Sequence, residues 1–164
     1  MNKAVCIDRD GVINSDEGHY YIFKTKDFKI NDGIIPSLKM LQDAGYLLII
    51  ISNQSGIAKG IYSRSDTDKV HDFLIKILKN EKINITEIYY CPHHPDQGRC
   101  ICRKPDSLML EKAIARFDID VNKSYLIGDS ERDIEAAVKA GLKGIKVDKN
   151  SNIYNVCLSI AGTR

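Results

Sequence analysis

The chain has 164 residues, 43% hydrophobic and 28% charged, which is typical of a globular protein with a hydrophobic core and excludes a disordered chain. Its net charge is only +2, with Lys and Arg spread along the sequence, so charge does not indicate binding to nucleic acid or an anionic membrane. The longest apolar run, residues 46–51, is too short to span a bilayer, and Met1 to Lys3 lead into a strand-like run instead of a signal peptide. We therefore expect one domain over residues 1–164, located in the cytoplasm.

Apolar runs of strand length alternate with segments of helical periodicity along the chain. The expected strands are Val5–Ile7, 46–51, 85–90, 124–128 and 144–147. The expected helices are Ile34–Ala44 (closed by Gly45), 70–78, Leu108–Phe117, Ile134–Ala140 and a short one over Ile153–Ile160. This alternation predicts a doubly wound, Rossmann-like α/β fold with a parallel sheet flanked by helices. No insertion is long enough for a large cap domain.

Polar residues follow three of the predicted strands. Asp8 and Asp10 come after the first, residues 52–54 after the second, and Asp129 after the fourth. Ligands of doubly wound sheets bind beyond the carboxyl ends of the strands, so these residues should gather at one edge. Side chains two apart on an extended segment point the same way, so Asp8 and Asp10 should face the site while Arg9 points away.

Three carboxylates at one edge repel one another unless a cation neutralises them. Asp8, Asp10 and Asp129 supply oxygen ligands, which suit Mg²⁺. Any one of these residues alone could equally be a helix cap or a solvated loop charge. Their joint position at strand ends favours a magnesium site.

Three of the five cysteines lie within twelve residues, in the segment CPHHPDQGRCIC. Cys91, His93, Cys100 and Cys102 together offer three thiolates and one imidazole, a closed tetrahedral set for Zn²⁺. A redox pair or free thiols is the alternative, and the spacing leaves His94 as a competing imidazole. A zinc ion here would be structural and would fix the loop 91–102. Cys6 and Cys157 are expected to be buried apolar residues.

Four segments in chain order resemble the motifs of the haloacid dehalogenase-like (HAD) superfamily of phosphatases. These segments are DRDGVIN (8–14), ISNQ (51–54), the Lys104 of CRKP, and GDSERD (128–133). The resemblance covers nearly the whole chain. Zinc-loop members of the superfamily match their imidazole ligand at His93, which favours this residue over His94.

The resemblance implies a reaction mechanism. Asp8 would be the nucleophile that forms an aspartyl-phosphate, and Asp10 the general acid and base. Ser52 and Lys104 would stabilise the phosphoryl group. Mg²⁺ would have three oxygen ligands: the Asp8 carboxylate, the Asp10 backbone carbonyl and the Asp129 carboxylate. Asp133 is expected to support this metal shell from outside or to cap a helix.

Within the superfamily, SNQSGIAKG (52–60) and DEGHY (16–20) resemble the heptose bisphosphate phosphatases more than the histidinol-phosphate phosphatases. The implied substrate contacts are Asp16, Glu17, Gly18, His19, Asn53, Gln54, Ser55 and Arg103. The implied activity is Mg²⁺-dependent hydrolysis of the 7-phosphate of D-glycero-D-manno-heptose 1,7-bisphosphate, in the supply of ADP- or GDP-heptose precursors for lipopolysaccharide.

Charge at a few positions bears on this substrate. Ser55 is neutral, whereas histidinol-phosphate phosphatases tend to place an acid there to meet an ammonium group. A bisphosphate needs a second cationic contact, for which Arg103 and Lys59 are candidates. Ser130 follows Asp129 where the heptose enzymes often carry Lys, so one candidate phosphate contact is missing.

Three alternatives stand beside this interpretation. The first is a histidinol-phosphate phosphatase or another small sugar-phosphate monoesterase. The second is a phosphorylation-sensing receiver domain, against which Asp10 argues because a receiver has no use for a second Asp placed as an acid. The third is a zinc-dependent binding module. Family members of this size are often monomers, so we expect a monomer with a small-molecule substrate and no nucleic-acid or membrane partner.

Overall fold

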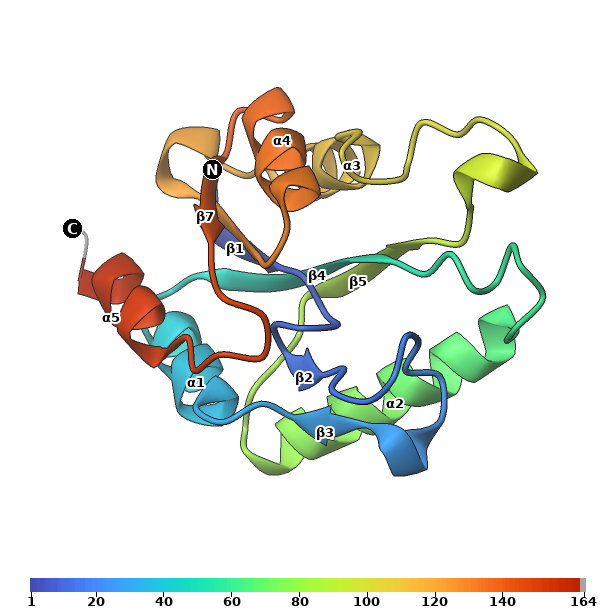
Figure 1. The fold of residues 1–164 in the computed structure, drawn as a ribbon. Helices are drawn as coiled ribbons and strands as arrows, with labels where there is room; N and C mark the ends of the chain where they lie inside the picture. Colours follow the sequence, from blue (N-terminus) through green and yellow to red (C-terminus); the bar gives the residue numbers. More distant parts are fainter. Residues whose placement is uncertain (163–164) are drawn as a thin grey trace.

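The computed structural model describes residues 1–162 and has a five-stranded parallel sheet at its centre (Figure 1). The strands are β1 (Ala4–Ile7), β4 (Leu47–Asn53), β5 (Glu87–Cys91), β6 (Tyr125–Gly128) and β7 (Lys143–Lys146). Their spatial order is β5-β4-β1-β6-β7, and all neighbouring strands run parallel. The chain therefore winds outward from β1 in both directions, and the carboxyl ends of β1, β4 and β6 lie next to each other.

Helices cover both faces of the sheet. They are α1 (Ile34–Asp43), α2 (Arg64–Asn80), α3 (Leu108–Phe117), α4 (Glu131–Lys139) and α5 (Tyr154–Gly162). Helices α3 and α4 lie over one face, and α1, α2 and α5 lie over the other (Figure 1). This arrangement confirms the doubly wound α/β fold.

Strand β1 shows why its sequence is apolar throughout. Val5 and Ile7 pack into the hydrophobic core beneath α1, α2 and α5, whereas Ala4 and Cys6 pack into the core beneath α3 and α4. Successive side chains of a strand point to opposite faces, so a strand covered on both sides has no polar position. The polar residues can begin only where β1 leaves the sheet, at Asp8.

Two helices begin before their apolar stripes do. Ser63 and Asp66 form a capping box at the start of α2, and Ser130 and Asp133 form another at the start of α4. In each, the serine hydroxyl and the aspartate satisfy N–H groups that the first turn leaves without partners. The sequence analysis followed hydrophobic periodicity and therefore placed both helix starts too late.

The remaining differences concern short elements. The expected helix over Ile153–Ile160 is α5, shifted by one to two residues. Strands β2 (Asn14–Ser15) and β3 (Lys29–Ile30) form a small antiparallel sheet that was not expected, because two residues are too few for a periodic pattern. Single turns of 3₁₀ helix occur at Thr25–Asp27, Pro95–Gln97 and Val121–Lys123. Thr163 and Arg164 of the expected domain 1–164 lie outside the described residues.

Among residues 1–162, none of the helices combines the length and the hydrophobicity that crossing a membrane requires.

Candidate active site

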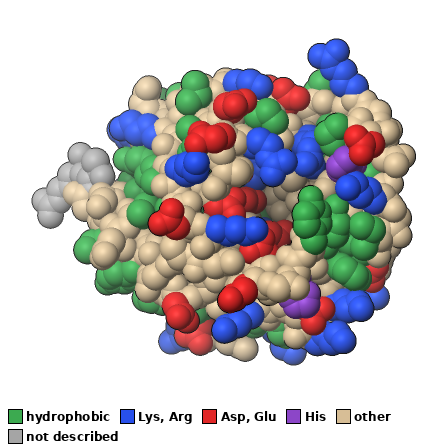
Figure 2. Space-filling model, viewed as in Figure 1, with side chains coloured by type: hydrophobic (Ala, Val, Ile, Leu, Met, Phe, Trp, Pro, Cys, Tyr) green, Lys and Arg blue, Asp and Glu red, His purple; other side chains and the backbone are tan. Residues whose placement is uncertain are grey.

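A cavity of about 280 Å³ opens beyond the carboxyl ends of β1, β4 and β6. Figure 2 shows acidic side chains in this hollow with basic side chains beside it. Its lining includes ten residues that the sequence analysis assigned to catalysis, Mg²⁺ or the substrate: Asp8, Asp10, Asp16, His19, Asn53, Gln54, Ser55, Arg103, Lys104 and Asp129. The fold thus brings together residues from both ends of the chain, as the positions of the motifs predicted.

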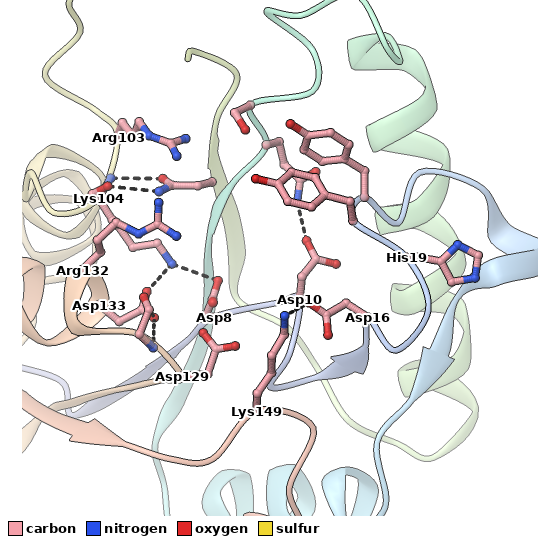
Figure 3. A pocket seen from close by; sticks show the side chains of 16 residues that line it. Asp8, Asp10, Asp16, His19, Arg103, Lys104, Asp129, Arg132, Asp133 and Lys149 are labelled. Atoms are coloured by element: carbon pink, nitrogen blue, oxygen red, sulfur yellow. Dashed lines mark hydrogen bonds and ion pairs between the residues drawn. The ribbon is translucent and has the colours of Figure 1, made fainter. Parts of the chain in front are cut away.

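Lys104 lies at the centre of the site, and its side chain is almost completely buried. Its Nζ is 2.9 Å from Asp8 Oδ1 and 2.6 Å from Asp133 Oδ1 (Figure 3). It also donates a hydrogen bond of 2.8 Å to the Ile51 carbonyl. Burial alone would lower the pKa of Lys104, but the carboxylates of Asp8 and Asp133 outweigh it and raise the pKa. The ammonium group therefore stays charged inside the protein.

The Asp8 carboxyl group responds to the same surroundings. Burial raises its pKa to about 7, even though the nearby Lys104 opposes the rise. Asp133 behaves differently, because Lys104 and Ser130 outweigh the effect of burial and lower its pKa. Its Oδ2 accepts hydrogen bonds from Ser130 N at 3.1 Å and Ser130 Oγ at 2.7 Å, and its Oδ1 pairs with Lys104. Asp133 therefore both caps α4 and holds Lys104 in place.

Carboxylate oxygens of Asp8, Asp129 and Asp133 all lie within 4.8 Å of one another, close enough to bind one cation. Burial, and then the Asp133 carboxylate, raise the pKa of Asp129. Gly11 has a φ of +84° and lies so close to Asp129 Oδ2 that a Cβ would overlap it. The loop after β1 can therefore approach Asp129 only because residue 11 is glycine. This oxygen-rich set fits Mg²⁺.

The Asp10 side chain is fixed by three neighbours. Arg9 Nη2 donates to its two oxygens at 2.9 and 3.0 Å, Asn14 Nδ2 donates at 3.0 Å, and Gln54 Nε2 donates at 2.8 Å. Gln54 is itself held by Tyr62, whose hydroxyl donates to Oε1 at 2.6 Å. The carboxylate of Asp10 therefore keeps one orientation in the cavity.

Arg9 is fully buried, which the sequence did not suggest. Strand alternation predicted that Arg9 would point away from the site, and Arg9 does not line the cavity. Its guanidinium group nevertheless donates hydrogen bonds to Asp10. The same group donates to the Ile22 carbonyl at 2.7 Å and lies 3.1 Å from His71 Nε2. Burial, and then the charge of Arg9, lower the pKa of His71 to about 3, so the imidazole is neutral and accepts from Arg9.

Asn53 positions the backbone of Lys104. Its Nδ2 donates to the Lys104 carbonyl at 3.1 Å, and its Oδ1 accepts from the Lys104 N–H at 3.0 Å. The end of β4 is thereby joined to the segment that follows the cysteine-rich loop.

Not every expected residue lines the cavity. Ser52 is buried and its Oγ accepts a hydrogen bond of 2.8 Å from Gln54, while Glu17 and Gly18 are exposed outside the lining. Lys59 is also exposed and outside it. Lining residues that the sequence analysis did not assign to the substrate are Tyr20, Tyr21, Ser130, Arg132, Asp133 and Lys149.

The cysteine-rich loop forms a second cluster. Cys91 Sγ lies 3.1 Å from Cys102 Sγ and 3.8 Å from Cys100 Sγ, and His93 Nδ1 lies 3.2 Å from Cys102 Sγ. Sulfur ligands at ~2.3 Å from a tetrahedral zinc would be ~3.8 Å apart, so the four groups could bind a zinc ion. His94 is not in the cluster, and its Nδ1 accepts a hydrogen bond from the Asp96 N–H at 3.1 Å.

Several known proteins are similar to this chain in sequence and fold. A family model described as HAD-hydrolase-like matches residues 101–152. The D-glycero-beta-D-manno-heptose-1,7-bisphosphate 7-phosphatase of Haemophilus ducreyi is 41% identical over 147 residues, covering 86% of this chain and 80% of that protein. The chain belongs to this family of HAD-like hydrolases.

Two further relatives extend the comparison. The D-glycero-alpha-D-manno-heptose-1,7-bisphosphate 7-phosphatase of Campylobacter jejuni is 44% identical over 140 residues, covering 85% of this HAD-like hydrolase and 78% of that protein. The crystal structure of D,D-heptose 1,7-bisphosphate phosphatase from B. bronchiseptica, complexed with magnesium and phosphate, has a TM-score of 0.83 and 31% identity. The structural match covers 98% of this chain and 87% of the B. bronchiseptica chain.

Replacing Lys104 with Met should destabilise this HAD-like hydrolase in magnesium-free buffer. The variant buries the Asp8 and Asp133 carboxylates without their cation, which typically costs about 3 kcal/mol. Urea unfolding at pH 7 measures the loss. Lys112→Met, at an exposed position of α3, is the control and should unfold as the wild type does. A Lys104→Met protein as stable as the control would contradict the central role of this ion pair.

Zinc binding by the cysteine-rich loop predicts about one equivalent of zinc per chain in the purified HAD-like hydrolase. Cys102→Ser should lose most of this zinc, because a serine hydroxyl is a poor ligand for it. Cys157→Ala, at a buried position of α5, should keep its zinc even if it is less stable. Metal analysis of the wild type, Cys102→Ser and Cys157→Ala measures the zinc content of each. A full equivalent of zinc in Cys102→Ser would exclude this ligand set.

Proposed function

We propose that this chain is a Mg²⁺-dependent phosphatase that removes the 7-phosphate of D-glycero-D-manno-heptose 1,7-bisphosphate through an aspartyl-phosphate on Asp8. The observation that carries the proposal is the Asp8 carboxylate in an open cavity, with Lys104 Nζ 2.9 Å away and Asp129 close by. Relatives at about 40% identity carry the name of this activity for both anomers of the sugar. The product would feed the synthesis of nucleotide-heptose precursors of lipopolysaccharide.

The residues of the chain account for both halves of the reaction. An Asp8 oxygen attacks phosphorus, the bond to the sugar oxygen breaks, and Asp10 gives its proton to that leaving oxygen. Water then attacks the aspartyl-phosphate while Asp10 accepts a proton, which releases phosphate and regenerates Asp8. The hydrogen bonds from Arg9, Asn14 and Gln54 keep Asp10 in position for both steps.

Charge on the phosphoryl group would be stabilised by Lys104 and Ser52. The Ser52 Oγ accepts from Gln54, which leaves its own proton available for a phosphoryl oxygen. Mg²⁺ would be held by the carboxylates of Asp8 and Asp129 and by the Asp10 carbonyl. When bound, it would neutralise phosphoryl oxygens that otherwise repel an anionic nucleophile.

We further propose roles for the residues around this centre. Arg103 would contact the phosphorylated sugar, and the polar side chains that face the cavity would bind its hydroxyl groups: Asp16, His19, Asn53, Gln54 and Ser55. Glu17 and Gly18 lie in the loop that carries two of these residues. Zinc would hold the loop 91–102 as a structural ion. We infer one domain over residues 1–164, acting as a monomer in the cytoplasm without a nucleic-acid or membrane partner.

Steady-state turnover of both heptose 1,7-bisphosphate anomers, histidinol phosphate and a panel of sugar monophosphates tests the substrate. We expect the highest kcat/KM for one of the heptose bisphosphates, because the cavity offers cations for a second phosphate and a neutral Ser55. A higher kcat/KM for histidinol phosphate would instead favour the histidinol-phosphate phosphatases.

Asp10→Asn tests the acid role. Losing the proton donor should lower kcat/KM on the heptose bisphosphate, which reports transfer of the phosphoryl group to Asp8, by about 10²–10⁴-fold. The loss in kcat/KM should be far smaller on p-nitrophenyl phosphate, whose leaving group needs no proton, because kcat/KM excludes the later step in which Asp10 acts as base. Equal losses on both substrates would mean that Asp10 is not the general acid, and an unchanged rate on both would favour a receiver domain.

A further inference from the structure

Besides Lys104, three cationic side chains line the cavity: Arg103, Arg132 and Lys149. They differ in how far their charge is already compensated. Lys149 Nζ lies 2.7 Å from Asp16 Oδ2, and this contact raises the pKa of Lys149. A substrate anion would have to compete with Asp16 for it, so Lys149 is a poor candidate for binding a second phosphate.

Arg132 has no such partner. It is an exposed residue in the first turn of α4, and within residues 1–162 its guanidinium group forms no hydrogen bond or ion pair. Its acidic neighbours are both engaged, since Glu131 pairs with Lys146 and Asp133 pairs with Lys104. Figure 3 shows the guanidinium group of Arg132 pointing into the cavity between Arg103 and Lys104.

A second cavity, of about 400 Å³, adjoins this side of the site, and Arg103, Lys104 and Arg132 line both. Arg99 adds a fourth cation. Among the described residues that line it, Asp106 is the acidic one, and it lies 3.4 Å from Lys139 Nζ. The space between α4 and the cysteine-rich loop is therefore strongly cationic.

The opposite wall of the first cavity is less cationic. Asp16, His19, Tyr20 and Tyr21 line it, and the lining cation beside them, Lys149, is already paired with Asp16. A substrate with a phosphate at each end would therefore be oriented by charge. Its reacting phosphate would lie at Asp8 and Lys104, its hydroxyl groups would face the Asp16 side, and its other phosphate would face the arginines.

We propose that Arg132, together with Arg103, binds the non-reacting phosphate of the bisphosphate substrate. A guanidinium group can hold two phosphate oxygens at once, and an unpaired one loses no existing ion pair on doing so. Lys59, the other candidate from the sequence, is exposed and lines neither cavity. This inference rests on the proposed function and identifies Arg132 as a residue that sets specificity.

The test compares two substrates, heptose 1,7-bisphosphate and the same heptose carrying only the 7-phosphate. The quantity measured is the ratio of kcat/KM on the first to kcat/KM on the second. Arg132→Ala should lower this ratio about 10- to 100-fold, as expected for losing one charged hydrogen-bonding partner. Arg132→Lys should lower it less, because it keeps the charge but not the paired donors. Lys59→Ala is the matched control and should keep the wild-type ratio.

The outcomes separate this inference from the proposed function. If the wild type prefers the bisphosphate and Arg132→Ala keeps that preference, Arg132 does not bind the second phosphate, although the proposed function stands. If Arg132→Ala loses activity equally on both substrates, Arg132 acts elsewhere and the inference is again wrong. If the wild type shows no preference for the bisphosphate, the proposed function fails and the inference fails with it.

Discussion

The buried ammonium group of Lys104 connects the parts of this protein that the reaction needs. It touches Asp8 at the end of β1, the carbonyl of Ile51 in β4, and Asp133 in the first turn of α4. A buried cation is tolerated only where carboxylates and a carbonyl replace its water, and a buried carboxylate only where a cation is close. Folding and the assembly of the phosphate site therefore depend on the same three contacts.

A second buried cation has a different task. Arg9 binds Asp10, the Ile22 carbonyl and a neutral His71, and so fixes the carboxylate that the proposed reaction uses as an acid. Lys104 lies beside one aspartate of the pair and Arg9 beside the other. Two carboxylates only two residues apart can thus have distinct surroundings, as separate roles in catalysis require.

The order of strands and helices could be predicted because strong hydrophobic patterns mark them, and parallel topology then placed Asp8, Asp10 and Asp129 at one edge, whereas Lys104 was identified only by the resemblance to a family motif. Individual hydrogen bonds and ion pairs between distant segments could not be predicted. The pair of Arg9 and His71 spans 62 positions and leaves no local pattern. Arg132 was overlooked because an unpaired arginine on a helix usually faces solvent, and only the position of α4 shows that it faces a cavity.

The end of β4 differs from the sequence-based prediction. The expected strand stopped at residue 51, but β4 continues to Asn53. Side chains alternate along a strand, so Ser52 and Asn53 point to opposite sides, and Asn53 lines the cavity while Ser52 does not. Ser52 is buried and its Oγ accepts a hydrogen bond from Gln54, which itself lines the cavity.

The paired hydrogen bonds between the Asn53 amide and the Lys104 backbone also bear on how such proteins diversify. The amide holds the peptide groups at the exit of the cysteine-rich loop, whatever path the preceding residues take. Insertions or deletions within that loop can then accumulate during evolution without displacing the lysine. The wall beside the arginines is free to change shape and to accept other phosphorylated compounds, while the chemistry at its base is inherited intact.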